Sequence, residues 1–267
     1  MIKVLVFTIL CLGFSNISTA QPVHICRNGS EYAPYVYWER VNGMVDKTKI
    51  TGATTELLEK IFDLVDLKYT QDLIPWKRCL QEVADFGKNK RYEMFTDGSF
   101  SEDRAKKYYI SAPIYKLHEG MWYSTKTFPN NVPIEKPSDL NQFKLCGILG
   151  NNYSWLKEFG VTAELYDGAK NINSALRMVS LNRCDFYFNS LEPSYGGAML
   201  GVYEIPKDVV GVQFPGKREL SMHLFISKTS PRGFELFTRI NNAVLLLQKR
   251  GVAESIYKKY VPGGSGL

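Results

Sequence analysis

The stretch TTELLEKIFDLVDLKYTQDLIPWKRCLQEVADFG, residues 54–87, contains two helical patterns with a strand-like segment between them. In the first pattern, five apolar side chains share one face at helical spacing: Leu57, Leu58, Ile61, Phe62 and Val65. This spacing predicts an amphipathic helix. The segment KYTQDLIP, residues 68–75, has the composition of a strand, and its last residue, Pro75, opens a second helix.

Strand-like segments flank this stretch at residues 22–29 and 92–98. The order strand, helix, strand, helix, strand predicts an α/β unit with a largely parallel sheet. The same alternation begins again after residue 142. Its expected strands are 143–150, 163–168 and 183–189, and its expected helices are 151–160 and 169–182. We therefore expect an α/β fold with two similar α/β lobes.

The first twenty residues have the pattern of a secretory signal peptide. Lys3 is followed by the apolar run VLVFTILCLGF and then by Ser18-Thr19-Ala20, which predicts cleavage after Ala20. A membrane anchor is the alternative. The apolar run is shorter than the roughly 20 residues that a spanning helix needs, so the pattern favours export with cleavage.

Cleavage would remove Cys11 and leave an even number of cysteines: Cys26, Cys79, Cys146 and Cys184. In an oxidising compartment this number indicates two disulfides, and three pairings are possible on paper. A zinc site is the alternative, but the chain has no C-x-x-C spacing and its histidines are scattered at His24, His118 and His223. We therefore expect no metal.

The net charge of +6 comes from acids and bases that are interspersed along the chain. No basic run carries interleaved aromatic residues, so we expect no nucleic-acid partner. The segment GVQFPGKR, residues 211–218, fits the start of a phosphate-binding loop. However, Arg218 stands where the magnesium-binding Ser or Thr is required, so the motif is incomplete.

Five stretches, in this order, resemble the family 3 extracellular solute-binding proteins. They are GATTELLEKIF (52–62), LIPWKRCLQEV (73–83), SFSEDRAKKYYISAPIY (99–115), KLCGILGNNYSW (144–155) and RCDFYFNSLEP (183–193). The resemblance extends from about residue 22 to residue 260. It implies the type II periplasmic-binding fold, in which two α/β lobes are joined by a hinge.

The resemblance also implies an organisation and a function. After the signal peptide, residues 1–20, we expect the first lobe at 21–115 and 216–262, the second lobe at 116–215, and a flexible tail at 263–267. The protein would be a periplasmic monomer that closes on a small amino acid or related carboxylate. It would deliver this ligand to a membrane transporter or report it to a membrane sensor, without a cofactor and without turnover.

In amino-acid binders of this family, a Ser and an Arg five residues later hold the α-carboxylate of the ligand. Ser99 and Arg104 have this spacing, and Gly98 is assigned to the same site. A guanidinium group can make two charge-assisted hydrogen bonds to a carboxylate. The alternative is a helix-start Arg that pairs with Asp103 or another neighbouring acid.

On the second lobe, the family's Gly-x-Thr turn is represented by Gly150, Asn151 and Asn152, followed by Tyr153. An N–H group at a helix start binds an anion whatever the side chain is, so this turn is assigned to the ligand site.

The chain departs from the family pattern after Asp185. Amino-acid binders carry an acid about five residues later that takes the α-amino group, whereas this chain has Asn189 and Ser190, and then Glu192. Asn189 and Ser190 are assigned to the ligand site, and the recognition of an amino group is left open.

The aromatic segment EYAPYVYW, residues 31–38, fits a first-lobe wall that stacks on the ligand. Tyr32, Tyr35 and Trp76 would form this wall, with packing in the core as the alternative. Glu31 is the nearest candidate to receive a ligand ammonium group.

Because Cys146 and Cys184 fall on neighbouring strands of this fold, the resemblance pairs them and leaves Cys26 to pair with Cys79. The rival function is an enzyme on the same fold, such as a dehydratase, with Glu31 or Glu192 as its acid.

Overall fold

The computed structural model describes residues 21–130, 132–261 and 264–267. The predicted signal peptide, residues 1–20, lies outside the described residues, as does residue 263 of the predicted tail. Within the described ranges, no helix is both long enough and apolar enough to cross a membrane.

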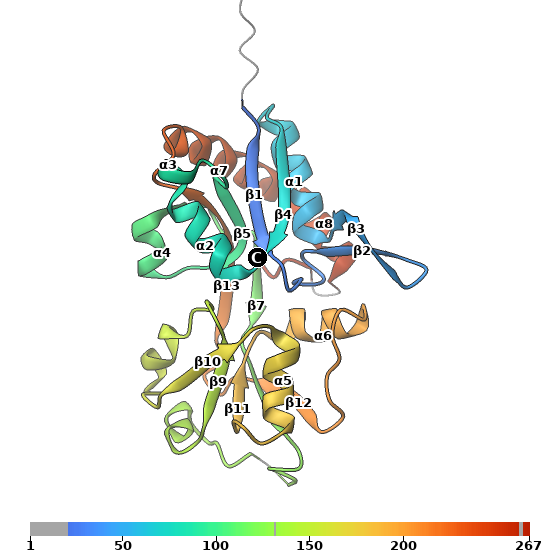
Figure 1. Cartoon of the computed structure of the whole chain (residues 1–267), viewed down its shortest axis with the longest axis vertical. Coiled ribbons are helices and arrows are strands. Elements are labelled where there is room, and N and C mark those ends of the chain that lie inside the picture. Colours follow the sequence, from blue (N-terminus) through green and yellow to red (C-terminus); the bar gives the residue numbers. More distant parts are fainter. Residues whose placement is uncertain (1–20, 131, 262–263) are drawn as a thin grey trace, which may run out of the picture.

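The first of two large sheets lies in the upper part of Figure 1. Along the sheet its strands are β4 (Tyr69–Ile74), β1 (Val23–Asn28), β5 (Met94–Ser99), β13 (Glu219–Ser227) and β6 (Tyr108–Ile110), and β7 (Tyr115–His118) also pairs with β13. Strand β1 runs parallel to β4 and β5, as the sequence pattern predicted, whereas β13 is antiparallel to all of its neighbours. We call this sheet and its helices the first lobe.

Helices cover both faces of the first sheet (Figure 1). They are α1 (Ala53–Leu64), α2 (Trp76–Ala84), α3 (Phe86–Asn89), α4 (Glu102–Lys107), α7 (Gly233–Lys249) and α8 (Val252–Tyr260). Successive side chains of a strand point to opposite faces. Met94 of β5 accordingly joins the core shared with α1, α7 and α8, while Phe95 joins the core shared with α2.

A two-stranded ribbon formed by β2 (Tyr37–Val41) and β3 (Met44–Thr51) projects from the side of the first lobe (Figure 1). Its turn is Asn42-Gly43, and both residues have positive φ, 52° and 78°. This is the conformation that a two-residue hairpin loop of this type requires. The ribbon was not predicted from the sequence, where residues 31–38 were assigned to a wall that stacks on the ligand.

The second sheet lies below the first in Figure 1. Along the sheet its strands are β10 (Leu165–Ala169), β9 (Leu145–Ile148), β11 (Phe186–Phe188), β8 (Gly120–Ser124) and β12 (Val209–Gln213). The helical segments with it are η1 (Pro137–Gln142), η2 (Ser154–Phe159), α5 (Ile172–Ser180) and α6 (Leu191–Met199). The helix expected at 151–160 is the 3-10 helix η2 at Ser154–Phe159, and it starts later because residues 151–153 form a loop that faces the first lobe. We call this sheet and its helices the second lobe.

The chain passes between the two sheets twice, and the two connections lie side by side. The first runs from β7 through Glu119 into β8, and the second runs from β12 through Arg218 into β13. The N–H of Glu119 donates to the carbonyl oxygen of Arg218 at 3.0 Å. The N–H of Phe214 donates to the carbonyl oxygen of Glu119 at 2.9 Å. A paired connection of this kind is a typical site for hinge motion.

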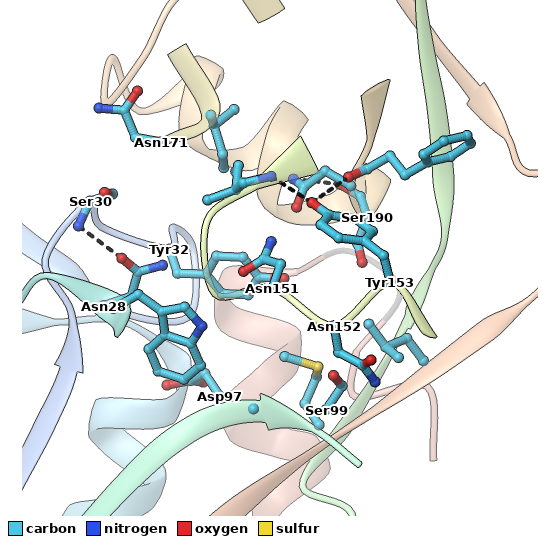
Figure 2. Close-up of a pocket in the computed structure, with 18 of the residues that line it drawn as sticks. Asn28, Ser30, Tyr32, Asp97, Ser99, Asn151, Asn152, Tyr153, Asn171 and Ser190 are labelled. Atoms are coloured by element: carbon cyan, nitrogen blue, oxygen red, sulfur yellow. Dashed lines mark hydrogen bonds between the residues drawn. The ribbon is translucent and has the colours of Figure 1, made fainter. Parts of the chain in front are cut away.

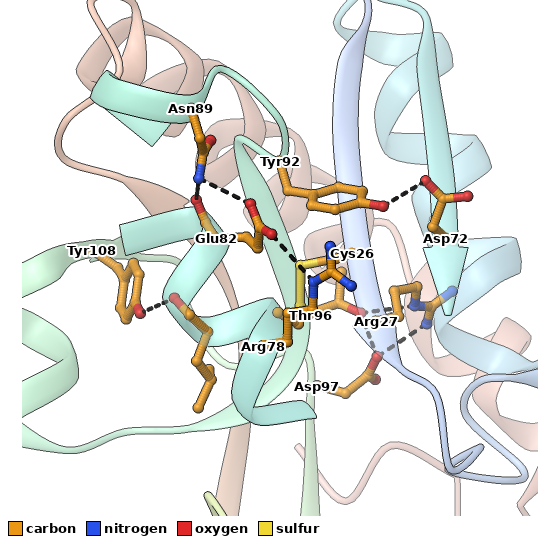
Figure 3. Close-up of a disulfide and its surroundings, with 12 residues drawn as sticks. Cys26, Arg27, Asp72, Arg78, Glu82, Asn89, Tyr92, Thr96, Asp97 and Tyr108 are labelled. Atoms are coloured by element: carbon orange, nitrogen blue, oxygen red, sulfur yellow. Dashed lines mark hydrogen bonds and ion pairs between the residues drawn. A yellow bond between two sulfur atoms is a disulfide. The ribbon is translucent and has the colours of Figure 1, made fainter. Parts of the chain in front are cut away.

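Each lobe contains one disulfide. Cys26 of β1 is bonded to Cys79 of α2, and Figure 3 shows the surroundings of this bond. Cys146 of β9 is bonded to Cys184, which lies just before β11. This is the pairing that the resemblance implied.

Candidate functional site

A cavity lies between the two lobes, and residues from both lobes and from the connections line it. Its volume is about 70 Å³, well below the roughly 300–1,000 Å³ of a typical ligand site. Figure 2 shows the second-lobe residues Asn151, Asn152 and Tyr153 facing Tyr32, Asp97 and Ser99 of the first lobe. The lobes are therefore close together in this structure.

All of the predicted ligand-binding residues except Tyr35 line this cavity. They are Glu31, Tyr32, Trp76, Gly98, Ser99, Arg104, Asn151, Asn152, Tyr153, Asn189 and Ser190. The fold thus brings together side chains that are up to about 160 positions apart in the sequence. Among the residues that the structure describes, no group of three or more His, Cys, Asp and Glu side chains could hold a metal ion.

Arg104 is buried beside the cavity, with 9% of its surface exposed. Strand β5 ends at Ser99, and Ser101 caps the start of α4 by accepting a hydrogen bond from the backbone N–H of Arg104. Within residues 21–130, 132–261 and 264–267, no carboxylate pairs with the guanidinium group. Its Nη1 donates to the backbone oxygen of Ser99 at 2.7 Å and to its Oγ at 3.0 Å. The charge is therefore positioned without being neutralised.

The alternative placement of Arg104, paired with Asp103, is wrong. The Asp103 side chain is 87% exposed and pairs with Lys106 at 2.8 Å. Burial lowers the pKa of the Arg104 guanidinium to about 10, which still leaves it charged at neutral pH. A buried charge without a partner is costly, so this site favours an anion.

The turn on the second lobe approaches the first lobe closely. Gly150 has φ +87°, and its carbonyl oxygen lies 3.5 Å from Nη2 of Arg104. The side-chain Nδ2 of Asn152 donates to the carbonyl oxygen of Phe100 at 3.2 Å, while its Oδ1 accepts from the N–H of Ser154 at 3.1 Å. Gly150 and Asn152 thus connect the two lobes across the cavity.

Tyr153 lines the cavity but its hydroxyl group is bound within the second lobe. The oxygen accepts a hydrogen bond from the N–H of Ile148 at 2.8 Å, and the group donates to the carbonyl oxygen of Phe188 at 3.3 Å. Burial raises the pKa of Tyr153, so the phenol is neutral. Its ring therefore offers the ligand a face and not a charge.

The predicted aromatic wall divides into two parts. Tyr32 and Trp76 line the cavity, and Trp76 packs edge-on against Phe95 at 5.4 Å. Tyr35 does not line the cavity. Its ring stacks on Tyr115 at 4.0 Å in the core of the first lobe, where it is 1% exposed.

Glu31 lines the cavity, but its carboxylate already has protein donors. Oε2 accepts hydrogen bonds from Nη1 of Arg40 and from the N–H of Trp38, each at 2.9 Å. Glu192 lies outside the cavity. Its Oε1 is 2.6 Å from Nδ1 of His118, and both carboxylate oxygens accept from the backbone N–H of His118.

On the second lobe, Asn189 and Ser190 connect the end of β11 to the start of α6. The Nδ2 of Asn189 donates to Oγ of Ser194 at 2.7 Å, which ties the side chain to α6. Its Oδ1 accepts no hydrogen bond from any residue in the described ranges. The position offers an acceptor to the cavity but no charge.

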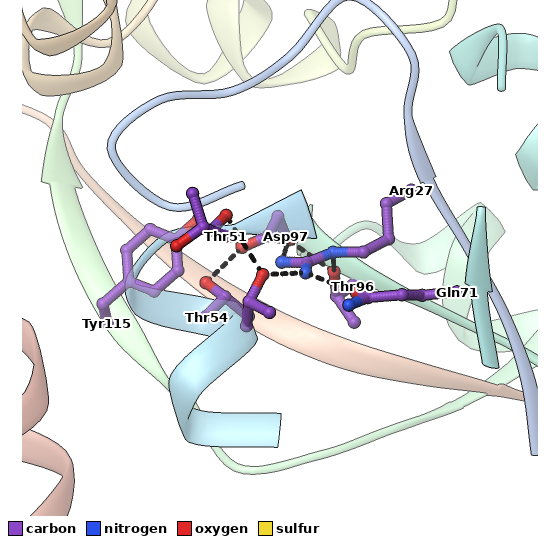
Figure 4. Close-up of polar contacts among 8 residues, drawn as sticks. Arg27, Thr51, Thr54, Gln71, Thr96, Asp97 and Tyr115 are labelled. Atoms are coloured by element: carbon purple, nitrogen blue, oxygen red, sulfur yellow. Dashed lines mark hydrogen bonds and ion pairs between the residues drawn. The ribbon is translucent and has the colours of Figure 1, made fainter. Parts of the chain in front are cut away.

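A buried ion pair that was not predicted from the sequence lies beneath the cavity. Arg27 is fully buried, and its Nη2 is 3.0 Å from Oδ2 of Asp97 (Figure 4). Oδ1 of Asp97 accepts from Thr54 at 2.6 Å and from Tyr115 at 2.9 Å. Both oxygens of Asp97 are therefore occupied, which makes it a fixed part of the cavity floor.

Glu119, in the first connection, is a further cavity residue that was not predicted from the sequence. It lines the cavity and is 4% exposed. Its Oε2 accepts from Nη1 of Arg218 at 3.3 Å, and the Arg218 guanidinium lies over the ring of Trp155 at 4.4 Å. Burial raises the pKa of the Glu119 carboxyl to about 7, with Arg218 opposing the rise and Glu192 adding to it.

No protein-family model matches the chain, and no curated protein sequence matches it. Several solved structures are similar to the structure of this chain. The arginine-, lysine-, histidine-binding protein ArtJ from Geobacillus stearothermophilus aligns with a TM-score of 0.70 at 15% identity, over 91% of this chain and 96% of its own. A histidine kinase sensor domain with similarity to periplasmic binding proteins aligns with a TM-score of 0.69 at 18% identity, over 91% and 97%.

A third similar structure is the ancestral amino-acid-binding protein AncCDT-1, described as a precursor of cyclohexadienyl dehydratase. It aligns with a TM-score of 0.66 at 20% identity, over 90% of this chain and 95% of its own. At these identities the likeness establishes the fold. The prediction of an α/β chain with two lobes in the type II periplasmic-binding fold is confirmed.

Proposed function

We propose that this chain is an exported, periplasmic solute-binding protein that closes its two lobes on a small ligand carrying a carboxylate. The observation that carries the proposal is Arg104, a buried cation beside the cavity that no carboxylate in the described part of the chain neutralises. A ligand carboxylate would complete the site by accepting from the guanidinium group. The monomeric state, the signal peptide and delivery to a membrane transporter are parts of the same proposal.

Two further observations support a site that closes. The cavity is lined from both lobes, and the connections between the lobes run side by side, as a hinge requires. The contact of Asn152 with Phe100 would break on opening and form again on closure. The similar ArtJ structure is described as binding basic amino acids, which favours an amino-acid-like ligand for this chain.

The rival proposal, an enzyme on this fold, needs an acid that is free to act in the cavity. Glu31 and Glu192, the two acids considered from sequence, are both held by protein donors. Glu119, which lines the cavity, is the acid that an enzyme would have to use. We propose binding without turnover, because the similar ArtJ structure is described as a binding protein. Incubation of the protein with each ligand that it binds, followed by mass spectrometry of the recovered ligand, tests this point, because any chemical change would favour the enzyme.

A thermal-shift screen of amino acids, polyamines and small carboxylates tests the main proposal. A ligand at 100 times its dissociation constant stabilises a protein by about 2.7 kcal/mol, which shifts the melting temperature measurably. Titration calorimetry then compares the wild type with Arg104→Gln. Loss of a buried charge partner should weaken binding by about 2–5 kcal/mol.

The matched control is Arg91→Gln, because the Arg91 side chain is 54% exposed and lies in the first lobe outside the cavity. It should leave affinity unchanged. Equal affinity of Arg104→Gln and the wild type for every ligand found would refute the proposed role of Arg104.

A further inference from the structure

We propose that Glu119 receives the cationic group of the ligand whose carboxylate Arg104 holds, so that the ligand class is an amino carboxylate, a zwitterion. This inference rests on the proposed function. It assigns the end of the ligand that the family pattern leaves open, because Asn189 stands where relatives carry an acid.

In the described part of the chain, the carboxylates that line the cavity are those of Glu31, Asp97 and Glu119. Arg40 and Trp38 hold Glu31, and Asp97 has partners on both oxygens. A ligand cation at Asp97 would displace an existing donor, and one at Glu31 would share the carboxylate with the guanidinium of Arg40.

Glu119 differs from them. Its Oε2 accepts from Arg218, whereas its Oε1 accepts no hydrogen bond from any residue at 21–130, 132–261 or 264–267. Glu119 is 4% exposed, so its carboxylate has little contact with water and gains from a donor on the open oxygen. A ligand ammonium or guanidinium group in the cavity would supply the missing N–H donor and an opposite charge.

Arg218 holds Glu119 without occupying the cavity side of the carboxylate. The Arg218 guanidinium is stacked on Trp155 and is joined to Glu119 by a single hydrogen bond of 3.3 Å. A monodentate bond leaves the second oxygen available. Arg218 therefore orients the carboxylate towards the ligand.

The charges around Glu119 make this recognition depend on pH. Arg218 favours the carboxylate and Glu192 opposes it, while burial favours the neutral acid, which places the carboxyl pKa at about 7. The remaining titratable groups facing it are the phenols of Tyr32, Tyr153 and Tyr187, whose pKa values are raised so that they stay neutral. Lys170 also lines the cavity.

A ligand cation binds the ionised form of Glu119. Ionisation rises from about one tenth at pH 6 to about nine tenths at pH 8, so affinity for a cationic ligand should rise about tenfold over this interval. A carboxylate without an amino group should show no such rise.

The experiment uses matched pairs of probes that differ only in the amino group: 4-aminobutyrate with butyrate, 5-aminopentanoate with pentanoate, and alanine with propionate. Titration calorimetry at pH 7.5 measures the preference for the amino member of each pair. We expect the wild type to prefer the amino member of at least one pair by tenfold or more. Glu119→Gln should abolish this preference and keep the affinity for the plain carboxylate within about threefold.

Glu102→Gln is the control, because Glu102 is exposed on α4 and does not line the cavity. It should keep the full preference. If Glu119→Gln fails to fold, the wild type alone tests the role of Glu119. The measured quantity is then the ratio of its affinity for the preferred amino probe to its affinity for the matching plain carboxylate, as a function of pH. A tenfold rise from pH 6 to pH 8 supports the assignment, and a flat ratio overturns it.

The failures are distinguishable. A wild type that binds plain carboxylates but shows no amino preference, or a Glu119→Gln variant that keeps the preference, overturns the role of Glu119 and leaves the solute-binding function in place. A wild type that binds none of the probes, nor any compound of the wider screen, overturns both.

Discussion

Substitution of Asp97 by Asn tests the buried ion pair beneath the cavity. Asn has nearly the shape of Asp, so the change removes the negative charge and leaves the packing in place. Arg27, which is 0% exposed, would then retain its charge with only neutral acceptors. These acceptors are Thr96 at 2.9 Å, Thr55 at 2.6 Å and Gln71 at 3.0 Å.

The expected loss follows from the charge that is left behind. Removal of one partner of a buried ion pair costs about 3–5 kcal/mol, because the other charge becomes uncompensated. Three neutral acceptors still bind Arg27, which places the expected loss at the lower end, about 3 kcal/mol. Domains are typically stable by about 5–15 kcal/mol, so this loss is a large fraction of the total.

The assay is urea unfolding of the ligand-free protein, followed by tryptophan fluorescence, for Asp97→Asn, Arg27→Met and the double variant. The double variant removes both charges, so it should lose at least about 2 kcal/mol less than the sum of the two single losses. Asp103→Asn, at an exposed position, should change stability by less than about 0.5 kcal/mol. A loss below about 1 kcal/mol for Asp97→Asn, or strict additivity, would refute the reasoning.

Two further predictions concern stability. Replacing Cys26 and Cys79 by Ser opens a loop of 53 residues and should lower the free energy of unfolding by about 2–4 kcal/mol, measured by urea unfolding; an unchanged midpoint would contradict it. The second concerns Glu119, whose folded carboxyl pKa of about 7 exceeds its ordinary 4.5, so its stabilising contribution is complete below pH 4.5 and is lost as pH rises through 7. The unfolding free energy of the wild type minus that of Glu119→Gln should therefore fall by about 2–3 kcal/mol between pH 5 and pH 8, and a constant difference would exclude the raised pKa.

The elements that the sequence predicted well are those with a local signal. The helical spacing after residue 53 corresponds to α1, and Pro75 precedes α2 as expected. The β2–β3 ribbon also had a local signal, since Asn42-Gly43 is a preferred hairpin turn. It was missed because the aromatic residues before the turn were assigned to a ligand-facing loop.

The site residues that could be predicted are those with a local sequence pattern, and the others depend on the folded chain. Ser99 and Arg104 were predicted to share one site. Ser99 is the last residue of β5 and Arg104 lies in the first turn of the next helix, α4, so the two are close along the chain. Tyr32 and Tyr35 are three residues apart, yet one lines the cavity and the other stacks in the core, and no local pattern separates them. Glu119 depends on Arg218, 99 positions away, and only the pairing of the two connections brings them together.

The two disulfides restrict motion within each lobe but not motion between the lobes. Among the described residues, each bond closes a loop inside one lobe, and neither joins the first lobe to the second. The disulfides therefore stabilise the fold of each lobe. The contacts that cross between the lobes are hydrogen bonds, which can break and re-form. Formation of the disulfides in an oxidising environment thus stabilises each lobe and leaves the two lobes free to move relative to each other.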